Sequence, residues 1–89
     1  MRTVISVIGK DTVGIIAKIS AVLSTHDINV LDITQSVLGD LFVMVMLVDI
    51  SKSKVDFSAL VAELDKLGND MGLKIHTMHE DVFNSMHRI

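Results

Sequence analysis

The chain has 89 residues, of which 49% are hydrophobic, and this length and composition suit one globular domain with a single core. Its formal net charge of −3 gives no electrostatic reason to expect nucleic acid or an anionic membrane as a partner, because both attract basic surfaces. With no Cys, Trp or Tyr in the sequence, disulfides, thiolate metal sites and cysteine nucleophiles are excluded, and few side chains remain for aromatic stacking.

The first half of the chain predicts a strand, a helix and a hairpin. Residues 3–8 are rich in β-branched side chains, which is typical of a strand. Apolar residues then recur at helical spacing over residues 15–26. Residues 29–37 alternate apolar and polar side chains and predict a half-buried strand, residues 39–40 mark a turn, and residues 41–50 form an apolar strand suited to the middle of a sheet.

The second half predicts another helix and another strand. A stripe of apolar residues runs over 57–71 at helical spacing, with Asp56 or Ser53 as the candidate N-cap and Gly72 as the C-terminal stop. Residues 73–80 alternate again and predict the fourth strand.

The order βαββαβ predicts an α+β, ferredoxin-like fold: a four-stranded antiparallel sheet with two helices on one face and the first and third strands in the middle. We expect residues 1–80 to form this domain, and residues 81–89 to form a short helical tail with Val82, Phe83 and Met86 on its apolar side. Because the third strand is apolar on both faces, we expect the tail, or a second copy of the chain, to cover the face that the helices leave open.

The chain shows no membrane or secretory signal. Its longest unbroken apolar run, residues 41–48, is far shorter than the roughly 20 residues of a membrane helix. The apolar stretch after Arg2 is interrupted by Lys10 and Asp11, and no small-residue cleavage pattern follows. We therefore expect a cytoplasmic protein.

Several activities known on this fold lack their residues here. RNA binding needs aromatic side chains on the central strands, and metal carriage needs a Cys pair in the first loop. No nucleophile stands beside a base, so we predict no catalytic residues, no cofactor and no enzyme activity. His76 and His79 would point to opposite faces of a strand, so we predict no metal site either.

The loop after the first strand carries the most specific pattern. It is Gly9-x-Asp11-x-x-Gly14-Ile15-x-x-x-Ile19, and it is followed by Ile28-Asn29-Val30 at the start of the second strand. Over about residues 2–80, this pattern and its spacing resemble the ACT domain. The ending, residues 82–89, is similar to the tail of small stand-alone bacterial ACT-domain proteins.

This resemblance implies a regulatory protein that binds an amino acid or a related small ligand between the subunits of a homodimer or a higher homo-oligomer. Thr12 could cap the first helix and leave backbone amides free for a ligand carboxylate, while Asp11 could accept the ligand's ammonium group. The implied ligand-binding residues are Asp11, Thr12, Val13, Gly14, Ile15 and Asn29.

Other interpretations remain open at this stage. The two glycines could simply shape a turn, and Asp11 could be a local turn former. Many ACT domains carry Pro where this chain has Val13, and together with the two-faced apolar strand this favours an alternative: a non-catalytic module with a degenerate pocket that binds another protein. An acyl-phosphate hydrolase relying on Lys10 is a third hypothesis.

Overall fold

The computed structural model describes residues 1–10 and 14–86. Its elements confirm the predicted order, including the short helix at the C-terminal end. They are β1 (Arg2–Lys10), α1 (Ile15–Thr25), β2 (Asn29–Leu38), β3 (Leu41–Asp49), α2 (Phe57–Met71), β4 (Lys74–His79) and α3 (Glu80–Met86).

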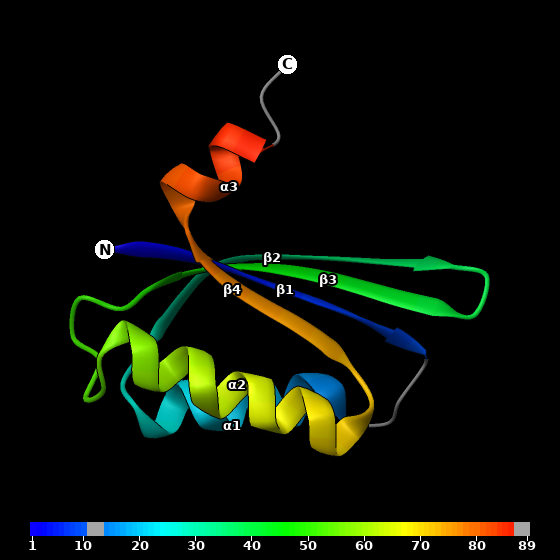
Figure 1. Ribbon diagram of the computed structural model, residues 1–89, viewed down its shortest axis with the longest axis horizontal. Helices are drawn as coiled ribbons and strands as arrows, with labels where there is room; N and C mark the ends of the chain where they lie inside the picture. The colour runs from blue at the N-terminus through cyan, green and yellow to red at the C-terminus, as the bar shows by residue number, and fades with distance from the viewer. Residues whose placement is uncertain (11–13, 87–89) are drawn as a thin grey trace.

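The four strands form one antiparallel sheet in the order β2-β3-β1-β4, so the predicted ferredoxin-like topology with β1 and β3 in the middle is confirmed. α1 and α2 both lie on one face of the sheet, and α3 stands on the opposite face (Figure 1). The face without α1 and α2 is called the open face below.

The hydrophobic core fills the space between the sheet and the two long helices. Burying one such aliphatic side chain contributes about 1.5–3 kcal/mol, so this layer supplies most of the stability of the fold. The core residues from the helices are Ile15, Ile19 and Leu23 of α1 and Leu60 and Leu64 of α2, and those from the central strands include Ile5, Val7, Met44, Met46 and Val48.

Both ends of α2 form as the sequence predicts. Asp56 is the N-cap, and its carboxylate accepts a hydrogen bond from the Ala59 backbone N–H at 2.8 Å. Gly72 ends the helix in the left-handed conformation with φ of 71°. The Leu73 N–H then donates to the Gly68 carbonyl at 2.7 Å, which turns the chain directly into β4.

The start of α1 differs from the prediction. The N-cap position belongs to Gly14, two residues after the predicted Thr12, and Gly14 adopts a left-handed conformation with φ of 86°. Glycine has no Cβ to oppose that conformation, which explains why the helix begins there. Gly14 also provides no side-chain cap for the first turn. Thr12 itself lies outside the described residues.

The prediction that the second strand is half-buried is wrong, because all ten residues of β2 are exposed. β2 forms the edge of the sheet beyond β3, and α1 and α2 pack under the other strands. A register shift between Val30 and Asp32 also leaves Leu31 without a paired position on β3, so the simple alternation does not continue through it.

α3 covers only one end of the open face. It contacts β1 and β4, and below it Val4 is buried although Val4 points away from the main core. Phe83 of α3 is half-buried, whereas Val82 and Met86 remain 48% and 65% exposed.

Candidate functional site

Asn29, the only predicted polar ligand contact among the described residues, lies at the start of β2 beside a hollow of about 370 Å³. The hollow separates the second half of α1 from the first residues of β2. Ser20, Ser24 and Asp27 supply its other polar side chains, above an apolar floor that includes Leu23. A second hollow, of about 210 Å³, is also lined by Asp27 and Asn29, so Asn29 borders two open spaces.

The turn between α1 and β2 sets the direction of these groups. Asp27 adopts a left-handed conformation with φ of 57°, which Asp tolerates better than most residues. The Ile28 N–H donates to the Leu23 carbonyl at 2.9 Å, so the chain folds back tightly at the end of the helix. As a result Ile28 enters the core, while Asp27 and Asn29 stay at the surface.

Contacts with the α2 side of the molecule hold this turn in place. His26 Nε2 lies 2.6 Å from Glu63 Oε1, which connects the end of α1 to α2. The Lys54 N–H donates to the His26 carbonyl at 3.0 Å, and its ammonium lies 3.4 Å from Asp27 Oδ2. Asp27 therefore has both a fixed backbone and a neighbouring positive charge.

The other described residues of the predicted site, Gly14 and Ile15, lie at the start of α1. The Ile15 side chain is only 3% exposed and belongs to the core, so its backbone N–H is the group it can offer to a ligand. First-turn amides have no acceptor within their own helix, and they carry the positive end of the helix dipole. Asp11, Thr12 and Val13 fall outside the described residues.

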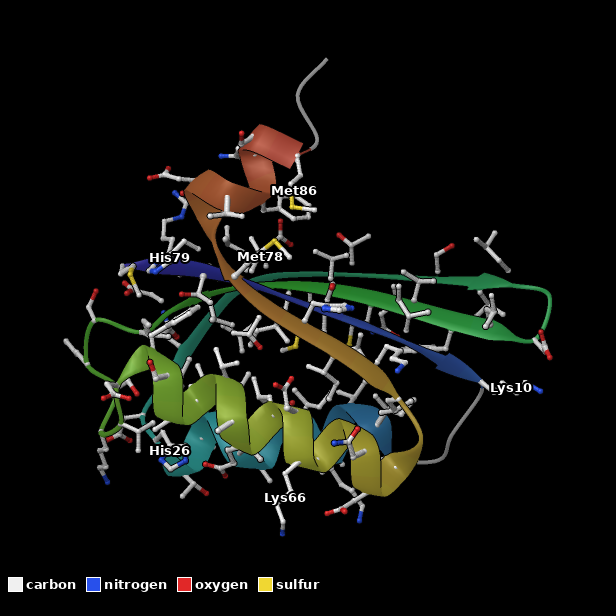
Figure 2. The ribbon with its side chains drawn as sticks, in the orientation of Figure 1. Lys10, His26, Lys66, Met78, His79 and Met86 are labelled. Atoms are coloured by element: carbon white, nitrogen blue, oxygen red, sulfur yellow. The ribbon has the colours of Figure 1, made fainter. Side chains whose placement is uncertain are left out.

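Gly14 and Asn29 do not meet within one protomer. α1 has eleven residues and separates them along its axis, a length of about 16 Å at 1.5 Å per residue. Figure 2 shows the same separation, with Lys10 at the end of β1 and His26 after α1 on opposite sides of the molecule. The structure therefore divides the predicted site into two halves.

Sequence reasoning missed Ser20, Ser24 and Asp27. The two serines are four residues apart and share one side of α1, which is a usable signal for a polar helix surface. Nothing local in the sequence indicates that this surface borders Asn29, because that depends on how the helix lies beside the strand.

A third hollow, of about 410 Å³, opens where β1 begins and α3 leaves β4. Four of its charged groups form two ion pairs: Arg2 lies 2.9 Å from Glu80, and the Met1 ammonium lies 3.3 Å from Asp49. Hydrogen bonds from the Ser51 hydroxyl and backbone N–H, helped by the Met1 ammonium, lower the pKa of Asp49 to about 2. Within residues 1–10 and 14–86, no three His, Asp or Glu side chains gather as a metal site would require.

Comparison with known proteins decides the family. A family model described as ACT domain matches residues 2–78. The chain belongs to the ACT-domain family. Proteins of this family contain a regulatory domain that typically binds amino acids or small metabolites. None of the helices in the described part of the chain has the length and apolar content needed to cross a membrane.

Relatives of this ACT-domain chain span two domains of life. A UPF0237 protein from Methanocaldococcus jannaschii is 52% identical over 88 residues, covering 99% of this chain and 98% of the relative, and one from Bifidobacterium longum is 46% identical with the same coverage. The expected restriction to bacteria is therefore too narrow.

Solved structures share this fold. An ACT domain protein from Streptococcus pneumoniae is 34% identical, with a TM-score of 0.81 over 98% of both chains. The regulatory subunit of aspartate kinase from Thermus thermophilus is 26% identical, with a TM-score of 0.64 over 85% of this chain and 49% of that one.

Proposed function

We propose that this ACT-domain protein is a non-catalytic cytoplasmic regulator that binds an amino acid or a related small metabolite between the two subunits of a homodimer. One observation carries the proposal. The two halves of the candidate site lie at opposite ends of α1, beside a β2 edge that is exposed along its whole length.

Antiparallel pairing of β2 with β2 of a second copy would join the two halves. A two-fold axis through the edge lays the start of one β2 beside the end of the other. Leu38, at the end of β2, aligns across the sheet with Leu41 and Lys10, and Lys10 is the last residue of β1 before the loop to Gly14. The pairing therefore brings Asn29 of one protomer to the same end of the dimer as Gly14 of the other.

The β2 edge has the surface that such pairing needs. On the side facing the helix layer, Val30, Ile33 and Val37 are 40%, 38% and 67% exposed. An edge strand also presents backbone N–H and C=O groups that a second strand can satisfy. Pairing would therefore bury apolar side chains and complete hydrogen bonds at the same time.

The joined site has complementary groups for an amino acid. The first-turn amides of α1, at Gly14 and Ile15, would stabilise the carboxylate at the positive end of the helix. Asp27 of the other protomer, with Asp11 from the loop, would attract the ammonium group. Asn29 can donate to the carboxylate or accept from the ammonium.

Binding can be measured by calorimetry and thermal unfolding across the twenty amino acids at millimolar concentration. A ligand present at a hundred times its dissociation constant should stabilise the fold by about 2.7 kcal/mol. Asn29→Ala should weaken binding about tenfold, the equivalent of one lost hydrogen bond, while Asn69→Ala on the exposed side of α2 should not. The absence of a response to every amino acid would contradict the proposal.

A second variant tests the position of the site. Val37→Lys places a charge on the exposed apolar row of β2 and should reduce both dimerisation and ligand binding. Ala62→Lys makes a comparable change on the exposed surface of α2 and should affect neither. Full ligand affinity in a monomeric Val37→Lys protein would place the site within one protomer.

A further inference from the structure

The open face of the sheet is only partly covered by its own chain. β3 has nine residues and is therefore about 30 Å long, whereas a helix such as α3 is about 10 Å wide. Val4, at the α3 end of the face, is 3% exposed, but Ile8 and Leu41, at the opposite end, are 40% and 41% exposed. The far end of this face therefore lacks a covering layer in the described protomer.

The residues at this bare end form one apolar patch. Register aligns Ile8 of β1 with Val43 of β3, and aligns Leu41 of β3 with Leu38 of β2. Directly opposed side chains in a sheet share one face, so these four lie together on the open face. Leu38 is the most exposed of the four, at 65%.

α3 also has an apolar surface that its own protomer leaves exposed. Val82 and Met86 are four residues apart, so they lie on the same side of this helix. They are 48% and 65% exposed, although both are apolar. Figure 2 shows Met86 projecting from α3 on the sheet side of the helix, where Met78 of β4 rises from the open face.

We infer that the open face is a second interface, in which a second copy of this chain places its α3 on the bare end of the face and receives the first copy's α3 in return. The two-fold axis lies between the sheets and perpendicular to the strands. Because α3 contacts β1 and β4, this axis carries the second α3 over the far ends of the same two strands. The two short helices then fill the gap between the facing sheets.

Charge favours a second copy as the occupant. The bare end carries Lys10 and Lys74, and α3 begins with Glu80 and Asp81, which the axis brings over this end. Lys10 lies 3.9 Å from Asp40 in an exposed ion pair, and Glu80 lies 2.9 Å from Arg2 in a pair that is half-buried on the Glu80 side. Exposed pairs such as the first contribute little and are readily exchanged. One chain thus holds both members of a complementary pair of surfaces.

Sedimentation equilibrium of the full chain tests the interface. Ile8→Lys should raise the dissociation constant of the open-face assembly roughly a hundredfold, because it places a charge on the part of the patch that belongs to β1, where the second α3 packs. Ala62→Lys, on the exposed side of α2, is the matched control and should leave the assembly unchanged. An unchanged mass in Ile8→Lys overturns the inference.

An exchange of charges provides a test that does not depend on hydrophobic packing. Lys74→Glu and Asp81→Lys should each weaken the assembly about five- to tenfold, and the double variant should recover most of the loss. Lys66→Glu, which changes the same charge on the side of α2 away from the sheet (Figure 2), should have no effect. If the losses of affinity in the two single variants simply add in the double variant, Lys74 and Asp81 do not interact across the interface.

The open-face assembly and the β2-edge dimer respond to different substitutions. With both interfaces present, Ile8→Lys and Val37→Lys should each halve the mass of the wild-type assembly. A wild-type dimer that Ile8→Lys dissociates and Val37→Lys leaves intact would support the open-face interface while contradicting the proposed ligand-binding dimer. The reverse pattern would overturn the open-face interface alone.

Discussion

The two edges of the sheet differ in how their own chain covers them. β4 forms one edge, where α2 packs against it and Ile75 is 5% exposed. β2 forms the other edge, and every one of its ten residues is exposed. The helix layer thus lies toward β1 and β4. The β4 edge is packed against a helix of its own chain, whereas the β2 edge is an exposed surface that a partner can cover.

The largest expected effect compares the same substitution at the two edges. Ile75→Ala should lower the free energy of unfolding by about 2–5 kcal/mol, because it leaves a cavity under α2. Ile33→Ala on β2 should cost only about 1 kcal/mol, because Ile33 is already 38% exposed. Urea unfolding at low protein concentration, where assembly contributes least, measures both.

Equal losses for the two variants would mean that the β2 edge is covered within one protomer. A second comparison at high protein concentration sharpens the result, because dimer formation adds to apparent stability. If β2 pairs with β2, the cost of Ile33→Ala should increase with protein concentration and the cost of Ile75→Ala should not.

The sequence was sufficient to predict the covered edge but not the exposed one. The stripe over 57–71, with Asp56 or Ser53 as the candidate N-cap and Gly72 after it, predicts the extent of α2, because both caps act through local backbone chemistry. The alternation of apolar and polar residues over 29–37 likewise predicts a half-buried strand, but all ten residues of β2 are exposed. Whether a helix lies under a given strand depends on where the layer of α1 and α2 packs across the sheet. A local sequence pattern contains no information about that position.

The candidate site shows the same limit. Spacing and type identify Gly14 and Asn29 as residues of interest, but their separation by the length of α1 follows only from the folded chain. The cap of α1 was misplaced because Thr12 is a good N-cap type, whereas the left-handed Gly14 decides where the helix begins. Asp27 was missed because its importance comes from a turn that folds back on α1.

A smaller effect on stability is expected from the N-cap of α2, the helix that covers the β4 edge. Asp56→Ala removes the acceptor for the Ala59 N–H and should lower the free energy of unfolding by about 1 kcal/mol. Asp65→Ala removes an exposed carboxylate from the middle of the same helix and should change stability by less than about 0.5 kcal/mol. Similar losses for both would show that the cap bond contributes little beyond general charge effects.

The smallest effect concerns Asp49, which lies at the end of β3 and aligns with Asn29 on the β2 side and Arg2 on the β1 side. Hydrogen bonds from Ser51 lower the pKa of Asp49 from 3.8 to about 2 in the folded state. The folded state therefore binds this proton less readily than the unfolded chain does, and the stabilisation is present above pH 3.8 and lost as the pH falls toward about 2. Asp49→Asn removes this dependence, so the Tm difference between wild type and this variant should shrink over that range. Asp65→Asn is the control for the loss of a carboxylate elsewhere. If the Tm difference between wild type and Asp49→Asn stays constant down to about pH 2, the Ser51 contacts do not favour the ionised form of Asp49.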